Sequence, residues 1–110
     1  MGLVLSDLLE DMGHAVCAIA ATEDDAVSAA QHHEPELMLV DVRLARGSGI
    51  DAMMRIMIMQ PVPYIYMSGS ILPPHARRSG TVALRKPFNA DELARAIQHA
   101  VDVPDTGSIA

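Results

Sequence analysis

Residues 37–42, which read LMLVDV, decide the fold because they form an apolar run of strand length with a single acid, Asp41, near its C-terminal end. Pro35 ends the helical pattern that precedes this run. Strands that are apolar along their whole length are typical of parallel sheets covered on both faces. We therefore predict a buried strand that carries a carboxylate at its tip.

The segments on either side of this strand alternate between strand and helix patterns. Thr22 precedes Asp25 by three residues, and Asn89 precedes Glu92 by three, which is a pattern typical of helix N-termini. Strands are predicted over residues 16–21, 64–67 and 82–84. Helices are predicted over residues 2–12, 22–33, 50–59, 75–79 (short) and 89–101.

This alternation predicts one α/β domain over residues 1–101, with a doubly wound parallel sheet and a flexible polar tail over residues 102–110. In such sheets the functional site lies beyond the C-terminal ends of the strands. Asp41, Ser68 and Lys86 each stand at a predicted strand end, so we expect them to meet there.

Composition narrows the class of function. The net charge of −6 disfavours binding to the phosphate backbone of nucleic acids. The single cysteine, Cys17, excludes a disulfide framework within the chain and indicates a reducing, cytoplasmic setting. No apolar run reaches the roughly 20 residues that a membrane span needs. We expect a protein with no nucleic-acid or membrane partner.

An acid at the end of an apolar strand needs an explanation, because an unpaired buried charge is costly. Asp41 either caps the turn that follows or acts as a nucleophile that forms an acyl phosphate. The second role needs a hydroxyl donor and a cation nearby, and Ser68 and Lys86 are of these types. Ser68 could instead simply end a strand, and Lys86 could be a solvated surface lysine.

Several segments resemble, in order and spacing, the receiver domains of two-component response regulators. The resemblance extends from residue 3 to about residue 101 and implies a flavodoxin-like sheet with the strand order 2-1-3-4-5. Its motifs are GHAV (13–16), PELMLVDVRL (35–44), GSGID (47–51), PVPYIYMSGS (61–70) and LRKPFNADELARAI (84–97).

The resemblance assigns a role to each residue of the predicted site. It implies that Asp41 is the phosphoacceptor, that Ser68 is the switch hydroxyl and that Gly69 leaves room for the phosphoryl group. Lys86 matches the lysine that pairs with the phosphoryl oxygens. The peptide bond before Pro87 is then expected to be cis.

Receiver domains also bind Mg²⁺, and the resemblance implies Asp41 and the backbone carbonyl of Arg43 as ligands. The family begins with an apolar strand followed by two acids that complete this site, whereas here only Met1 and Gly2 precede Leu3, the first apolar residue of the predicted helix. We therefore expect strand 1 to be missing and Mg²⁺ binding to be impaired. A start assigned too far downstream, a truncated piece, or a degenerate receiver would each explain this, and residues 3–5 forming the strand is a further alternative.

The resemblance implies a signalling domain and no enzyme. It would take a phosphoryl group from a histidine kinase or a phosphotransfer protein and act by protein contact. The alternative is a pseudo-receiver that dimerises or docks without phosphorylation. The methionine-rich segment 53–59 is compatible with either core packing or a homodimer surface. A third alternative, a phosphatase with an aspartyl-phosphate intermediate, would need a second acid as general acid or base, and none lies near Asp41 in the sequence.

Overall fold

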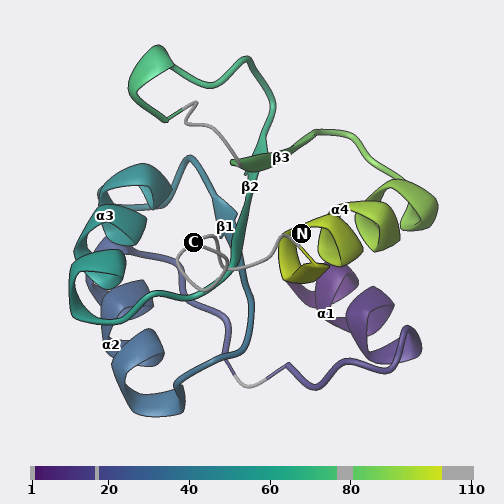
Figure 1. Cartoon of the computed structure of the whole chain (residues 1–110), viewed down its shortest axis with the longest axis horizontal. Helices are drawn as coiled ribbons and strands as arrows, with labels where there is room; N and C mark the ends of the chain where they lie inside the picture. Colours follow the sequence, from purple (N-terminus) through teal and green to yellow (C-terminus); the bar gives the residue numbers. More distant parts are fainter. Residues whose placement is uncertain (1, 17, 77–80, 103–110) are drawn as a thin grey trace.

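The computed structural model describes residues 2–16, 18–76 and 81–102, and a parallel three-stranded sheet lies at its centre (Figure 1). Its order is β1 (Met38–Asp41), β2 (Tyr64–Ser68) and β3 (Val82–Arg85). The register pairs Asp41 with Met67 and Ser68 with Arg85. The C-terminal ends of the three strands therefore lie together at one end of the sheet.

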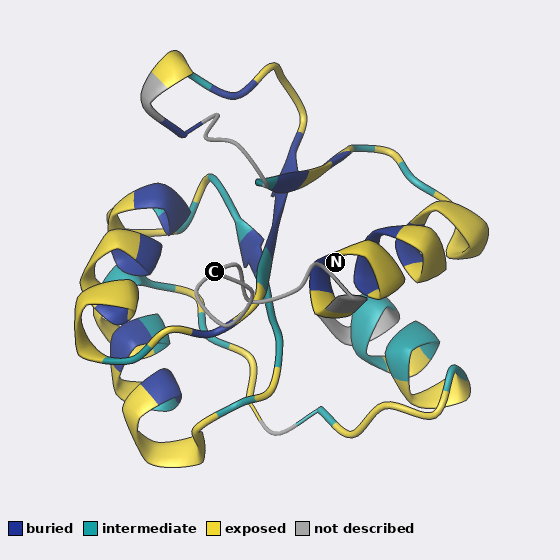
Figure 2. Ribbon diagram, in the orientation of Figure 1, coloured by how far each residue is buried: buried dark blue, intermediate teal, exposed yellow. Residues whose placement is uncertain are grey.

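Helices cover both faces of this sheet, as predicted (Figure 1). On one face, α2 (Glu23–His33) and α3 (Gly49–Met59) pack against Val40 and Tyr66. On the other face, α1 (Gly2–Asp11) and α4 (Ala90–Asp102) form a second core with Ile65, Leu84 and Leu39. Figure 2 shows that the helices turn their buried sides toward the sheet.

The predicted helix starts are confirmed by their capping contacts. The side chain of Thr22 accepts a hydrogen bond from the backbone N–H of Asp25 at 3.1 Å and thereby caps α2. At the start of α4, the Asn89 side chain accepts from the Glu92 N–H at 2.8 Å, and Glu92 accepts from the Asn89 N–H at 3.1 Å. These contacts satisfy N–H groups that a helix leaves without partners.

An ion-pair cluster joins α2 to α3 at the surface. The guanidinium of Arg55 lies 2.8 Å from Asp24 and 3.1 Å from Glu23. The hydrogen bond to Asp24, followed by that to Glu23, raises the pKa of Arg55 above its ordinary value. These two ion pairs link the start of α2 to the middle of α3.

The prediction of a strand over residues 16–21 is wrong. Residues 14–16 and 18–20 have no regular secondary structure, and Thr22 forms only an isolated bridge with Arg46. A strand exists through pairing with a neighbour, and among the described residues the segment has such a contact only at its end, where the N–H of Ala45 donates to the carbonyl oxygen of Ala21 at 2.9 Å. The alternative of a strand over residues 3–5 is also wrong, because these residues lie within α1.

The short helix predicted over residues 75–79 is a 3₁₀ turn, Pro74–Ala76, within the described residues. A proline pair can begin a helix but gives no N–H groups to continue one. Asp102, the first residue of the predicted tail, belongs to α4. The rest of that tail, residues 103–110, lies outside the described residues, as do Cys17 and residues 77–80.

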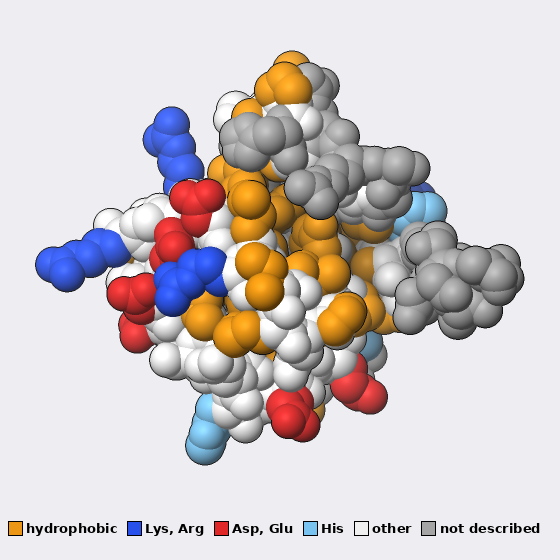
Figure 3. Space-filling view, turned by 60° about the vertical axis from the view of Figure 1, so that its left-hand side comes forward, with side chains coloured by type: hydrophobic (Ala, Val, Ile, Leu, Met, Phe, Trp, Pro, Cys, Tyr) orange, Lys and Arg blue, Asp and Glu red, His pale blue; other side chains and the backbone are white. Residues whose placement is uncertain are grey.

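The methionine-rich helix α3 contributes to both the core and the surface. Met53 and Ile56 are fully buried, whereas Ile58 is 86% exposed and Met54, Met57 and Met59 are also exposed. Figure 3 shows hydrophobic side chains at the surface of the side that carries α2 and α3. Among the described helices, none combines the length and the apolarity that crossing a membrane requires.

Candidate functional site

Asp41 and Lys86 meet at the C-terminal end of the sheet, although β2 lies between their strands. The Lys86 Nζ lies 2.6 Å from Oδ2 of Asp41. The side chains of Lys86 and Asp41 are 22% and 33% exposed, so the pair lies at the surface and is accessible to a reactant. The sequence motif thus brings a carboxylate and an ammonium group together.

The backbone around Lys86 directs its side chain toward this end of the sheet. Its N–H donates a hydrogen bond to the carbonyl oxygen of Ser68 at 2.8 Å, which continues the pairing of β2 with β3 by one residue. The bond between Lys86 and Pro87 is cis.

The second carboxylate oxygen of Asp41 binds the turn that follows β1. Oδ1 accepts a hydrogen bond from the N–H of Arg43 at 3.2 Å. The contact is the turn-capping role that the sequence left open as an alternative. It uses one oxygen only, and it coexists with the ion pair to Lys86.

The hydroxyl of Ser68 is engaged within its own turn. Ser68 is 7% exposed, and its Oγ donates to the carbonyl oxygen of Ser70 at 2.7 Å and accepts from the N–H of Ser70 at 3.1 Å. A Cβ added to Gly69 would meet no atom within 4 Å, so the space beside this residue is open. Ser68 therefore lies on the strand next to that of Asp41, and its hydroxyl is hydrogen-bonded to the backbone of Ser70.

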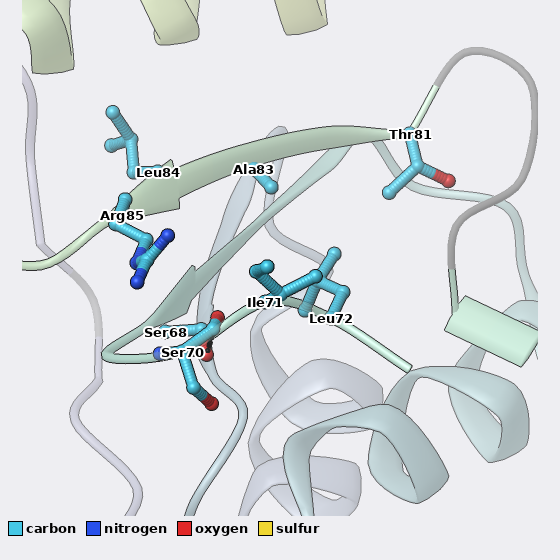
Figure 4. A pocket seen from close by; sticks show the side chains of 8 residues that line it. All are labelled: Ser68, Ser70, Ile71, Leu72, Thr81, Ala83, Leu84 and Arg85. Carbon is cyan, nitrogen blue, oxygen red and sulfur yellow. Dashed lines mark hydrogen bonds between the residues drawn. The ribbon is translucent and has the colours of Figure 1, made fainter. Parts of the chain in front are cut away.

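A cavity of about 360 Å³ borders the site on the side of Ser68 (Figure 4). Arg85 points from β3 toward the side that carries Ser68 and Ser70, and Ala83 contributes only a methyl group. Asp41 and Lys86 do not line this cavity. Its lining residues are Ser68, Ser70, Ile71, Leu72, Thr81, Ala83, Leu84 and Arg85.

Two glycines that the sequence analysis did not select shape the loop after Asp41. A Cβ on Gly49 would overlap the carbonyl oxygen of Asp41, and the N–H of Gly49 donates to Val42 at 3.0 Å. Gly47 has φ +78° and lies against the side chain of Glu23, where a Cβ would also overlap. Both glycines belong to the GSG sequence at 47–49, and only glycine fits these two positions, but the sequence does not show which residues they approach.

The described residues do not form a complete Mg²⁺ site. No group of three or more His, Cys, Asp or Glu side chains gathers there in an arrangement that could hold a metal. Asp41 is the carboxylate at the site, and Lys86 and the turn already occupy its oxygens. Mg²⁺ needs several oxygen ligands in octahedral geometry. Asp41 together with the Arg43 carbonyl that the family resemblance implies as a ligand does not meet that requirement.

The comparison with protein families agrees with this geometry. Residues 2–98 match the model of the response regulator receiver domain. The chain belongs to this family. Receiver domains of this family are regulatory and generally bind Mg²⁺ at their phosphorylation site.

A curated relative is the transcriptional regulatory protein PdtaR of Mycobacterium tuberculosis, which is 34% identical over 101 residues. The match covers 88% of this chain and 49% of PdtaR, so the chain spans about half the length of this relative. A protein-glutamate methylesterase/protein-glutamine glutaminase of Haloarcula marismortui is 40% identical over 68 residues, which is 62% of this chain and 18% of that protein.

Solved receiver structures share the fold. The receiver domain of PhyR from Erythrobacter litoralis is 30% identical with a TM-score of 0.82, and the match covers 94% of this chain and 82% of that one. PhyR from Bartonella quintana, an anti-anti-sigma factor, is 31% identical with a TM-score of 0.82 over 97% of this chain and 45% of that one. The predicted fold class is thereby confirmed.

Proposed function

We propose that Asp41 accepts a phosphoryl group from a phosphohistidine of a histidine kinase or a phosphotransfer protein. The contact of Lys86 Nζ with Asp41 Oδ2 at 2.6 Å is the observation that carries the proposal. A cation thus lies beside Asp41, the carboxylate at the end of β1. The partially exposed position of both groups leaves a path for a second protein.

The reaction is a displacement at phosphorus. A carboxylate oxygen of Asp41 forms a bond to phosphorus while the bond from phosphorus to the imidazole nitrogen breaks, and the electron pair of that bond stays on the imidazole. The acyl phosphate carries more negative charge than the carboxylate it replaces. Lys86 then serves as counter-charge for the phosphoryl oxygens, which is an electrostatic role that favours the transition state.

Ser68 and Gly69 would adapt to the new group. The open space beside Gly69 offers room for phosphoryl oxygens. For Ser68 to donate to one of them, its O–H must leave the carbonyl oxygen of Ser70. That exchange replaces a hydrogen bond to a neutral carbonyl oxygen by one to a charged phosphoryl oxygen, and hydrogen bonds to charged acceptors are the stronger ones. The turn at residues 68–70 would therefore change with phosphorylation and alter the surface for a partner.

Intact-mass spectrometry after incubation with acetyl phosphate and Mg²⁺ tests this proposal. The wild-type chain and Asp91→Asn, which changes an exposed acid on α4, should each gain the mass of one phosphoryl group. Asp41→Asn should gain none. Equal masses before and after incubation of the wild type, with a phosphohistidine donor as well as with acetyl phosphate, would refute it.

A second function is favoured by one observation, the incomplete set of acids around Asp41 in the described residues. In this alternative the domain docks or dimerises without phosphorylation, and the exposed side chains Met54, Met57, Ile58 and Met59 supply an apolar contact. It predicts that the mass of the chain stays unchanged after incubation with a phosphodonor. It also predicts a dimer in light scattering, which Ile58→Glu should dissociate.

The partner in both cases is a protein, in a cytoplasmic setting. The role of PhyR as an anti-anti-sigma factor supports a contact with another regulatory protein. The acidic net charge of −6 disfavours a direct nucleic-acid contact by this domain. The regulatory character of receiver domains supports a role without catalysis on a small substrate.

A further inference from the structure

The cavity shown in Figure 4 lies on the solvent-facing side of β3. Successive side chains of an extended segment alternate between its two faces, so Thr81, Ala83 and Arg85 belong to one face. Val82 and Leu84 belong to the other face and are buried in the core that α1 and α4 form. Ala83 and Arg85 are both exposed, so this face of β3 is accessible to a ligand.

The short side chain of Ala83 leaves room in this cavity. β3 forms one wall, and the segment 70–72, which follows β2, forms another (Figure 4). Leu72 is 7% exposed and belongs to the core of α2 and α3, so it gives the cavity an apolar lining. The volume of about 360 Å³ falls within the range of small-molecule sites, which is roughly 300–1,000 Å³.

Arg85 brings a positive charge to the cavity. The register places Arg85 opposite Ser68, and its guanidinium is directed toward the side that carries Ser68 and Ser70 (Figure 4). Asp41, the carboxylate at this end of the sheet, is already paired with Lys86. Among the described residues, the side chain of Arg85 has neither an ion-pair partner nor a hydrogen-bond acceptor. The guanidinium is therefore available to an anion from outside the chain.

The cavity is polar at one end and apolar beyond it. The polar end is formed by Arg85, Ser68 and Ser70, and the apolar part by Ile71, Leu72 and Ala83 (Figure 4). A ligand that fits both parts has an anionic group joined to an apolar body. The planar fork of one guanidinium matches one carboxylate through two parallel hydrogen bonds. Among the described lining residues Arg85 is the one cation, which favours a monoanion over a phosphate dianion.

We propose that this cavity binds a free small carboxylic acid, as its anion, with a compact apolar body such as a single ring. The carboxylate pairs with the guanidinium of Arg85, and the ring covers Ala83 and Leu72 and removes their apolar surface from water. The domain would then respond to a small molecule in addition to a phosphoryl group. Binding requires no phosphorylation, so this proposal and the proposed phosphoryl transfer can fail independently.

Phenylacetate is the probe, titrated into the isotopically labelled chain and followed by NMR. We expect saturable shifts of the amides of Ser70, Leu72 and Arg85, with a dissociation constant on the order of millimolar for a ligand of this size. Phenylacetamide, which has the same shape without the charge, should bind about tenfold more weakly. Acetate, which has the charge without the ring, should also bind about tenfold more weakly.

Two pairs of matched variants locate the site. Arg85→Gln removes the cation of the cavity, and Arg95→Gln removes an exposed cation on α4. Ala83→Leu fills the cavity, and Ala94→Leu adds the same side chain at an exposed position of α4. The first variant of each pair should weaken the binding of phenylacetate at least about tenfold, whereas the second should leave it unchanged. All four positions are exposed, so circular dichroism should show an intact fold in each variant.

Equal binding of phenylacetate and phenylacetamide would overturn the proposal, as would equal binding by Arg85→Gln and Arg95→Gln. Amide shifts confined to residues outside the cavity would overturn it as well. A short peptide with an internal Phe-Asp pair should bind no more tightly than phenylacetate. Tighter binding of the peptide would refute the assignment to a free acid, because the carboxylate would then come from a partner protein.

Discussion

Replacement of Lys86 by Met should separate the stability of the fold from the chemistry of the site. The methionine keeps most of the apolar stem and removes the ammonium group that contacts Asp41 at 2.6 Å. The two side chains are 22% and 33% exposed, so water screens the pair and solvates each group when the other is missing. Ion pairs at the surface contribute about 0.2–1 kcal/mol, whereas breaking a buried pair costs about 3–5 kcal/mol.

We therefore expect Lys86→Met to lower the free energy of unfolding by less than about 1 kcal/mol. A double-mutant cycle with Asp41→Asn, measured by urea unfolding with circular dichroism, should give a coupling energy in the same range. High salt should reduce this coupling further. The rate of phosphoryl transfer to Asp41 in Lys86→Met should fall by a much larger factor, because the lysine faces the charge that develops in the transition state.

A coupling energy of about 3 kcal/mol or more would show that the pair is a structural element of the core. A full rate of phosphorylation in Lys86→Met would show that the lysine has no part in the transfer. Either result would refute the reasoning from exposure and distance. Lys86→Arg is the control for charge, since it restores a cation without the compact ammonium group.

Three further outcomes are expected. Gly49→Ala should lower the free energy of unfolding by about 1–3 kcal/mol, because its Cβ would overlap the backbone of Asp41. Gly69→Ala, at an open position, should change the free energy of unfolding by less than about 1 kcal/mol. Urea titration measures both. Ile56→Ala should cost about 2–5 kcal/mol and Ile58→Ala less than about 0.5 kcal/mol by the same assay, because the first is fully buried and the second 86% exposed. Ser48→Ala should cost about 1 kcal/mol by removing the cap of α3, and Ser48→Asp should restore it in thermal unfolding.

The meeting of Asp41 and Lys86 was predictable because it depends on topology. Parallel strands place their C-terminal ends at one end of the sheet, so Asp41 at the end of β1 and Lys86 just after β3 lie within reach of the long lysine side chain across β2. The helix starts at Thr22 and Asn89 were predictable for a local reason, since each cap involves residues three apart. Both inferences need only a few residues of the right type and their place at a strand end or a helix start.

The rest depended on contacts that no local pattern encodes. Residues 16–21 have a strand composition, yet no strand among the described residues pairs with them, and pairing decides whether such a segment becomes a strand. The need for Gly49 arises from its approach to Asp41, eight positions earlier in the chain, and the sequence shows only a glycine in a loop. The partner of the Ser68 hydroxyl, the carbonyl of Ser70, depends on one side-chain rotamer.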